Sequence, residues 1–400
     1  MKQLKTQIVI AGAGPVGAVT AYYLAQKGID VVLLEAGGSN AQDLRASTFH
    51  PPTLEMLDEL GITQKLIDKG LKAPVFHFRE RKTGEVIDFD LSEISDRTKF
   101  PFRIQCEQYH LSSMLSSELE NSEKAQVLFN HRVVGFHQNS GGVEVYAEAP
   151  ESIIKIEADY LIGADGSNSI IRKWLETDFI GFTYPEKFLC FSTEEPIEET
   201  IPNLSYVNYV SDPKEWLVLL RVPKLWRVLV PATEEQSDAF LTSDTHKSEV
   251  FDRLIGNGSA VETKHRTIYR VHQRVAKKFV HDRVIIIGDA AHLNNPIGGF
   301  GMNSGIHDAV NLCEKLERIY SGSDADELLG KFERQRHKTT HDFIQAQTIR
   351  NMEYLSQGDS SEHQLRKSEM ERNRSDVASR RAYLLRQSMI ESLEKQKAIV

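Results

Sequence analysis

Residues 8–17 read IVIAGAGPVG, and this stretch decides the fold. A short β-branched run leads into three glycines with the spacing G-x-G-x-x-G, and a helical pattern then continues until Gly28. The next apolar run, Val31–Leu34, is typical of a parallel strand buried on both faces, and it ends at Glu35. Together these features predict a strand, a helix and a second parallel strand joined as one βαβ unit.

Each glycine of the motif has its own physical reason. Gly12 lets the chain turn tightly out of the strand, Gly14 removes a side chain where backbone approaches a pyrophosphate, and Gly17 allows close packing of the helix. The unpaired amides at the start of the helix then point toward phosphate oxygens. Glu35, at the tip of the second strand, is placed to accept hydrogen bonds from a ribose diol. We therefore predict a dinucleotide site at this turn.

Two later segments also place carboxylates at the ends of strands. The apolar strand that ends at Ala164 runs into Asp165, within a turn, DGSNSIIR, that opens a helix. A further strand, Val284–Ile287, runs into Asp289 and then into a glycine-rich loop at residues 295–303. Ligands of parallel α/β sheets bind in the crevice beyond the carboxyl ends of the strands. We therefore expect both carboxylates to lie beside the ligand of the first motif.

The rest of the chain predicts an interrupted architecture. Alternating apolar residues predict a hairpin at 75–91 and strands within 127–146 and 187–271, whereas helical spacing predicts helices over 100–119 and from about residue 303 onward. The fold class we expect is α/β: a Rossmann-like dinucleotide-binding domain with an inserted antiparallel β-sheet substrate domain and a C-terminal helical region. The expected boundaries are 1–73, 96–186 and 272–340 for the dinucleotide-binding domain, 74–95 and 187–271 for the β domain, and 341–400 for the helical region.

Composition narrows the classes of function. The 400 residues carry 48 Lys plus Arg against 57 Asp plus Glu, a net charge of -9, which argues against a surface that neutralises nucleic acid. The three cysteines stand far apart without a C-x-x-C pair, so we expect neither a disulfide framework nor a metal site. The first apolar run is too short for a signal peptide, and no stretch reaches the roughly 20 apolar residues of a membrane span. We expect a reducing, cytoplasmic location and no nucleic acid partner.

The three motifs together resemble those of the single-component FAD-dependent aromatic hydroxylases, the para-hydroxybenzoate hydroxylase-like class A flavoprotein monooxygenases. The resemblance rests on GAGPVG with Glu35, on DGSNSIIR, and on GDAAHLNNPIGGFGMN at 288–303. It implies FAD as the cofactor and NADPH or NADH as the co-substrate. It also implies contacts of Asp289 with the ribityl chain, and of Arg45 and Gln105 with the pyrophosphate or ribityl region. The cofactor-binding residues predicted on this basis are Gly12, Gly14, Pro15, Val16, Gly17, Glu35, Ala36, Arg45, Arg103, Gln105, Val133, Asp165, Gly166, Arg172, Gly288, Asp289, Pro296, Gly299, Gly301, Met302 and Asn303.

Three further features bear on the cofactors. Phe300 stands where many relatives carry Gln, which changes the surface near the flavin. The sequence lacks a second G-x-G-x-x-G after a strand, so we expect the nicotinamide to bind transiently on a surface shared with FAD. Asp165 and Arg172 are candidates for contact with either cofactor. A helix beginning near Ser304 would direct its positive end toward the flavin ring.

Candidate residues on the substrate side carry a weaker signal. His292, Tyr206 and Arg221 are the catalytic candidates, because they lie near a predicted strand end or in the β region. Tyr209 is a candidate for an aromatic pocket, and Arg227 for the neutralisation of an acidic or phenolate substrate. The alternative for each is a structural role, since an aromatic residue on a strand packs in the core and a charged residue faces solvent.

The resemblance implies a monooxygenase that uses molecular oxygen, through a flavin C4a-hydroperoxide, to hydroxylate an activated phenolic or N-heteroaromatic small molecule. An FAD-dependent reductase of the geranylgeranyl reductase type is the alternative, and a binding or escort protein is a further one. The W-x-W-x-I-P segment of flavin halogenases is absent. We expect a monomer or homodimer without membrane contact. For the charged tail at 367–400, a dimer interface or a membrane surface stays open beside a solvated helix.

Overall fold

A six-stranded sheet carries the predicted phosphate-binding turn. The computed structural model describes residues 2–41, 46–212, 215–355 and 361–400. The strand order is β19-β20-β13-β2-β3-β9, and all neighbours run parallel except β19, which pairs antiparallel with β20. The strands are β2 (Ile8–Ala11), β3 (Val31–Leu34), β9 (Ala125–Leu128), β13 (Tyr160–Gly163), β19 (Val280–His281) and β20 (Val284–Ile286). Strands β2, β3, β13 and β20 are buried along their whole length, which explains their continuous apolar sequences.

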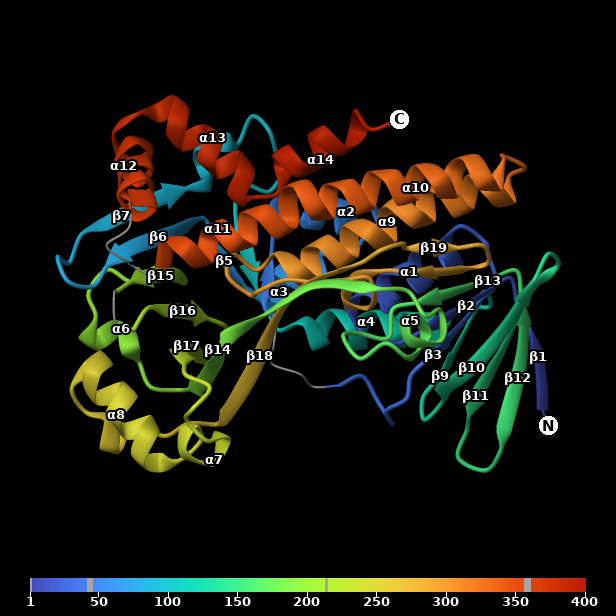
Figure 1. The fold of residues 1–400 in the computed structure, drawn as a ribbon, viewed down its shortest axis with the longest axis horizontal. Coiled ribbons are helices and arrows are strands. Elements are labelled where there is room, and N and C mark those ends of the chain that lie inside the picture. Colours follow the sequence, from blue (N-terminus) through green and yellow to red (C-terminus); the bar gives the residue numbers. More distant parts are fainter. Residues whose placement is uncertain (1, 42–45, 213–214, 356–360) are drawn as a thin grey trace.

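An eight-stranded sheet forms the second layer, at the opposite end of the molecule from β1 and β12 in Figure 1. Its order is β21-β18-β14-β17-β16-β15-β6-β7, and its neighbours are antiparallel except β6 and β15. The strands are β6 (Val75–Glu80), β7 (Val86–Asp90), β14 (Phe179–Thr193), β15 (Val207–Ser211), β16 (Leu217–Arg221), β17 (Trp226–Ala232), β18 (His265–Ala276) and β21 (His292–Leu293). Both predicted insertions therefore contribute strands to one sheet, and the long strands β14 and β18 extend beyond the insertion boundaries that we predicted.

Two smaller sheets complete the β structure. One has the order β1-β12-β11-β10, formed by Lys2–Lys5, Ile153–Ala158, Gly142–Glu148 and Arg132–Asn139. The other has the order β4-β8-β5, formed by Thr48–Phe49, Arg103–Gln105 and Leu71–Ala73. The second sheet corrects the helix predicted over 100–119, because β8 occupies its first part and the helix begins only at Gln108.

The helices flank the sheets. In the dinucleotide-binding part they are α1 (Pro15–Gln26), α2 (Pro51–Glu59), α3 (Thr63–Lys69), α4 (Gln108–Glu120) and α5 (Ile170–Trp174). Helices α6 (Ile197–Thr200), α7 (Asp238–Leu241) and α8 (Asp244–Ile255) lie within the region that we predicted to be β-rich. Helix α8 was missed because its polar sequence, DTHKSEVFDRLI, has few apolar residues to reveal a helical period.

The C-terminal region is helical, as predicted. It comprises α9 (Phe300–Tyr320), α10 (Ala325–Thr339), a π-helical turn (Thr340–Gln345), α11 (Ala346–Leu355), α12 (Ser361–Ser375), α13 (Val377–Gln387) and α14 (Ile390–Lys397). Helix α9 packs on α1, and α13 lies beside the β6–β7 hairpin (Figure 1). On α13, the Tyr383 ring lies 4.6 Å from the Phe89 ring, and Arg381 pairs with Asp96 at 2.9 Å. The last helices therefore close over the substrate sheet.

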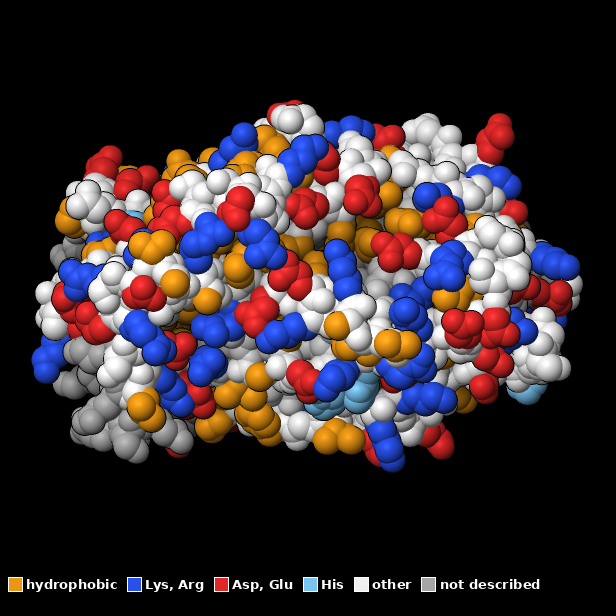
Figure 2. All heavy atoms as spheres, turned by 90° about the horizontal axis from the view of Figure 1, so that it is seen from above, with side chains coloured by type: hydrophobic (Ala, Val, Ile, Leu, Met, Phe, Trp, Pro, Cys, Tyr) orange, Lys and Arg blue, Asp and Glu red, His pale blue; other side chains and the backbone are white. Residues whose placement is uncertain are grey.

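The outer face of these helices has a mixed charge. Figure 2 shows Lys and Arg side chains interspersed with Asp and Glu over the face on which α10 and α14 lie. Such a face lacks the single-sign field that attracts nucleic acid. Among the described helices, none combines the length and the apolar character needed to cross a bilayer.

Candidate active site

One cavity of about 720 Å³ is lined both by the loops beyond the six-stranded sheet and by strands of the eight-stranded sheet. Gly14, Gly166 and Asp289, from three segments far apart in the sequence, all line it. This is the arrangement that the three sequence motifs predicted. We call the part lined by these loops the cofactor wall and the part lined by β14 to β18 the substrate wall.

The glycine motif closes the turn and leaves one open position. A Cβ atom at Gly17 would lie 1.9 Å from the Gly12 oxygen, and one at Gly12, where φ is +97°, would lie 2.4 Å from the Ala164 oxygen. At Gly14 a Cβ atom would meet nothing within 4 Å. Gly12 and Gly17 therefore allow the backbone to pack, whereas Gly14 keeps open space at the start of α1. That space fits a pyrophosphate at a helix N-terminus.

Glu35 is fixed in place beside this turn. Its carboxylate accepts hydrogen bonds from the backbone amides of Ala13, at 2.8 Å, and Gly37, at 2.9 Å, and it lines the cavity. A carboxylate has about four lone-pair sites, so two acceptor sites remain for the hydroxyls of a ribose.

The turn DGSNSIIR at 165–172, called the DG segment, forms a second part of the cofactor wall. Asp165 accepts hydrogen bonds from the amides of Ile170, at 2.8 Å, and Ile171, at 3.3 Å, and so caps α5. Its other oxygen, Oδ1, is buried and makes no hydrogen bond within the described part of the chain. Arg172 donates to the Ala290 oxygen at 2.9 Å and lies over the Phe179 ring at 3.9 Å. Burial lowers the pKa of Arg172, whose side chain joins the DG segment to the Gly288–Ala290 turn.

A buried polar network supports the part of the cofactor wall that contains Asp289. Asp308, on α9, accepts hydrogen bonds from the Gly288 amide at 3.0 Å, from His292 Nε2 at 2.7 Å and from Arg336 Nε at 2.6 Å. All the side chains of this network are almost completely buried. Asn303 donates to the oxygens of Thr48 and Gly299 at 2.8 Å and 2.7 Å. These bonds hold a loop whose backbone faces the cavity.

Helix α9 begins earlier than predicted. It starts at Phe300 rather than near Ser304, and Gly299 precedes it with φ of +72°. The left-handed conformation of Gly299 lets the loop end and the helix begin within one residue. The first turn of α9 therefore borders the cavity, which is lined by Gly299, Gly301 and Met302.

The substrate wall is built from side chains of five neighbouring strands. Val218 and Leu220 line the cavity from β16, and Tyr269 and Val271 line it from β18. Arg227 lines it from β17 and is only 4% exposed. The remaining lining residues on these strands include Cys190, Tyr209 and Leu229. The wall is thus apolar and aromatic around the Arg227 guanidinium, and β18 also brings Arg270, His272 and Arg274 to the cavity.

Polar neighbours position this guanidinium. Arg227 donates hydrogen bonds to Ser47 Oγ at 3.2 Å and to the Tyr269 hydroxyl at 3.4 Å, and its Nη2 lies 3.7 Å from Cys190 Sγ. Burial alone would lower the pKa of Arg227, but the nearby Cys190 and Tyr269 outweigh it and raise that pKa. The group is therefore a fixed cation beside apolar side chains such as Val218 and Leu229, which suits an anionic or electron-rich ring oxygen.

The predicted cofactor residues separate into two groups. Those that line the cavity are Gly14, Pro15, Val16, Glu35, Gly166, Arg172, Asp289, Pro296, Gly299, Gly301 and Met302. Those that do not line it are Gly12, Gly17, Ala36, Arg103, Gln105, Val133, Asp165, Gly288 and Asn303. Most of the second group brace the wall through packing or hydrogen bonds. Arg45 lies outside the described residues.

The three catalytic candidates do not line the cavity. Tyr206 is 41% exposed, Arg221 lies 5.6 Å from the Trp226 ring, and His292 is bonded to Asp308 in the buried network. In contrast, Ser47, Thr48, Gln108 and Tyr109 do line it and were missed by sequence analysis. Their only sequence signal would have been proximity to β4 and β8, which are too short to show a period.

The geometry fits FAD, and comparison with known proteins agrees. The open position at Gly14, the fixed Glu35 and the Asp289 edge form a continuous wall for a dinucleotide with a flat ring system. The model of a family described as the FAD binding domain matches residues 5–347. The chain belongs to this family. FAD is therefore its cofactor, and the predicted α/β fold class is confirmed.

Relatives of this FAD-binding protein are aromatic monooxygenases. It is 30% identical over 357 residues to para-nitrophenol 4-monooxygenase of Pseudomonas sp. strain WBC-3, covering 88% of both chains. It is 29% identical to 6-hydroxy-3-succinoylpyridine 3-monooxygenase of Pseudomonas putida, covering 88% of this chain and 89% of the relative. The crystal structure of p-nitrophenol 4-monooxygenase from Pseudomonas putida DLL-E4 matches with a TM-score of 0.91 at 26% identity, over 98% of this chain and 99% of that one. The predicted resemblance to FAD-dependent aromatic monooxygenases is confirmed.

Proposed function

We propose that this enzyme uses NADPH or NADH and molecular oxygen to hydroxylate a phenolic or N-heteroaromatic small molecule. The observation that carries the proposal is the buried Arg227, which faces the same cavity as Gly14 and Asp289. The similarity to a nitrophenol monooxygenase and a hydroxypyridine monooxygenase supports a ring that bears an ionisable hydroxyl. None of the relatives we compared supports the reductase alternative.

The residues of the cofactor wall bind and orient the cofactor. We assign the start of α1 to the pyrophosphate, Glu35 to the adenosine ribose, and Asp289 to the ribityl chain. The loop from Gly299 to Met302 would lie against the flavin ring, and Arg45 stays a proposed contact of the pyrophosphate or ribityl region. Bound FAD would supply the redox chemistry, which comprises hydride acceptance and oxygen activation.

The substrate wall prepares the ring for attack. Arg227 stabilises the phenolate form of the substrate, and a phenolate donates more electron density to the ring carbon that is hydroxylated. Apolar side chains exclude water from the pocket, so that activated oxygen reacts with the substrate and not with water. These side chains are Val218, Leu220, Leu229 and Val271. The C-terminal helices pack on β6 and β7, where the Tyr383 ring contacts Phe76 and Phe89.

The domain division and the setting remain part of the proposal. We propose that 1–73, 96–186 and 272–340 form the FAD-binding domain, that 74–95 and 187–271 form the substrate domain, and that 341–400 form the helical cover. A reducing, cytoplasmic compartment agrees with Cys106, Cys190 and Cys313, which are all free and buried. We propose a monomer or homodimer.

The test is turnover of the purified, FAD-loaded enzyme with a panel of phenols and hydroxypyridines that includes 4-nitrophenol. We expect a yellow protein whose oxidation of NADPH or NADH is stimulated by one of these compounds, with one atom of ¹⁸O₂ incorporated into the product. Turnover without oxygen would favour the reductase, and a protein that binds FAD but catalyses neither reaction would favour a binding role. Either result would overturn the proposal.

A further inference from the structure

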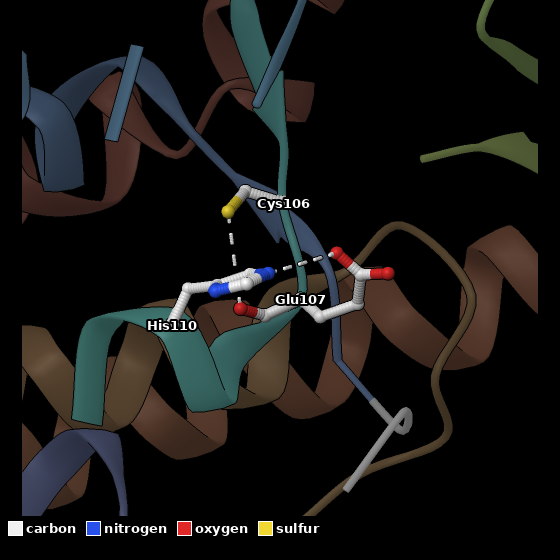
Figure 3. Close-up of side chains that lie close together, drawn as sticks. All are labelled: Cys106, Glu107 and His110. Carbon is white, nitrogen blue, oxygen red and sulfur yellow. Dashed lines mark hydrogen bonds and ion pairs between the residues drawn. The ribbon is translucent and has the colours of Figure 1, made fainter. Parts of the chain in front are cut away.

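Three side chains at the start of α4 face one another outside the cavity. Cys106, Glu107 and His110 bring a sulfur, a carboxylate oxygen and an imidazole nitrogen to within 4.8 Å of one another (Figure 3). Glu107 Oε2 lies 3.8 Å from His110 Nε2, and the Cys106 thiol reaches only the Glu107 main-chain oxygen, at 3.9 Å. The cluster therefore contains three metal-ligating atoms without a strong bond between them.

The local fold holds these three residues together. The amides of Cys106 and Gln108 donate to the oxygens of Ser47 and Ala46, at 2.7 Å and 2.9 Å, which fixes the backbone on both sides of Glu107. Glu107 is the residue before α4, and His110 lies on the first turn of that helix. The spacing of three residues places the His110 and Glu107 side chains on the same side of the helix start.

Glu107 is a buried carboxylate with basic groups beside it. Its side chain is only 9% exposed, its carboxylate lies 3.8 Å from His110 Nε2, and its charge also interacts with the buried Arg227 guanidinium. Buried carboxylates are normally paired or bound to a metal ion, because burial of an uncompensated charge costs free energy.

We propose that Cys106, Glu107 and His110 bind a thiophilic divalent cation, and that Zn²⁺ suits the donor set best. Zinc accepts sulfur, nitrogen and oxygen ligands in tetrahedral geometry, and with three protein ligands the fourth position holds water. Mg²⁺ and Ca²⁺ prefer oxygen alone. On binding, the Cys106 sulfur exchanges its proton for the metal, the proton leaves to solvent, and nothing is oxidised.

The site lies beside the cavity and goes beyond the proposed function. Gln108 and Tyr109, between its ligands, line the cavity, but the three ligands themselves do not. A bound ion would tie β8 to the first turn of α4 and so hold Gln108 and Tyr109 in place. The sequence analysis expected no metal site because it looked for paired cysteines, and this cluster mixes three residue types.

Metal content and metal affinity test this proposal without any measurement of turnover. The FAD-loaded enzyme is stripped with chelator and titrated with Zn²⁺, and with Co²⁺, whose visible bands report coordination at wavelengths beyond the flavin absorption. We expect one Zn²⁺ per chain, tetrahedral Co²⁺ bands and a higher Tm with Zn²⁺. Cys106→Ser, Glu107→Gln and His110→Ala should each lower the affinity at least tenfold and abolish the rise in Tm.

His265→Ala is the matched control, since His265 is exposed and distant in sequence from the cluster. It should bind Zn²⁺ like the parent. Wild-type enzyme that binds no stoichiometric Zn²⁺ would overturn the proposal, and so would binding that survives all three substitutions. Because these readouts require only the folded enzyme, their failure is distinct from failure of the hydroxylase assay.

Discussion

The two walls of the active-site cavity are built in different ways. The cofactor wall consists largely of backbone, shaped by glycines and braced from behind by the buried Asp308 network. The substrate wall consists of side chains from β16, β17 and β18, among them the buried Arg227. The first wall therefore tolerates few substitutions, whereas the second changes its chemistry with each residue. The difference explains how one cofactor site serves enzymes with different substrates.

The largest effect should follow from an added methyl group in the cofactor wall. In Gly17→Ala the new Cβ would lie 1.9 Å from the Gly12 oxygen, so the backbone must shift, and we expect unfolding to become easier by roughly 3 kcal/mol or more. Gly14→Ala has no such clash and should fold normally, yet lose FAD because the methyl group occupies the phosphate space. Thermal denaturation of the apoproteins and FAD titration separate the two effects. Equal stability of the two variants would contradict the account.

Removal of a charge from the substrate wall should weaken substrate binding and leave FAD binding unchanged. Arg227→Met removes the buried guanidinium, and we expect KM for a phenolic substrate to rise about 100-fold while FAD stays bound. Arg221→Met is the matched control, because Arg221 lies on the neighbouring strand but does not line the cavity. Steady-state kinetics with both variants provide the measurement. A large rise in KM for Arg221→Met without one for Arg227→Met would contradict the account and favour Arg221, the residue predicted from the sequence.

Removal of a charge from the cofactor wall should weaken FAD binding. Asp289→Ala should raise the Kd for FAD roughly tenfold to 100-fold, the cost of a charged hydrogen bond to the ribityl chain. Asp178→Ala is the control, since Asp178 is exposed and pairs with Lys277 at 3.5 Å. Fluorescence titration of released flavin measures the Kd. Unchanged FAD affinity in Asp289→Ala would reject the assigned contact.

The smallest effect concerns pH and the scaffold behind the cofactor wall. Burial and the Arg336 guanidinium lower the pKa of His307 from 6.5 to about 3, and the neutral ring bonds to Thr53 Oγ1 at 3.0 Å. The unfolded chain therefore binds a proton that the folded chain rejects, so stability falls as pH falls from 6.5 toward 3. His307→Gln should reduce the slope of the free energy of unfolding against pH by up to about 1.4 kcal/mol per pH unit.

Denaturant unfolding at several pH values measures the slope. His265→Gln, at an exposed position, should keep the slope of the parent. If the curves of His307→Gln and the parent run parallel below pH 6.5, the buried histidine makes no such contribution.

The two walls also differ in how far the sequence predicts them. Gly14, Glu35 and Asp289 were found because a turn, a strand end and a helix start each require particular residue types at fixed spacing. Arg227 and Tyr209 were considered only as alternatives to surface and core residues, because period-two alternation does not say which face of a strand meets the cavity. Helix α8 and the short strand β8 were missed because neither has enough apolar residues to show a period.

The most direct test of the two-wall account is a crystal structure of the enzyme with FAD and a phenolic ligand bound together. The account predicts the pyrophosphate at Gly14 and the phenolic oxygen within hydrogen-bond distance of the Arg227 guanidinium, both in one cavity. A phenol bound elsewhere, with the Arg227 side chain turned away from it, would contradict the account.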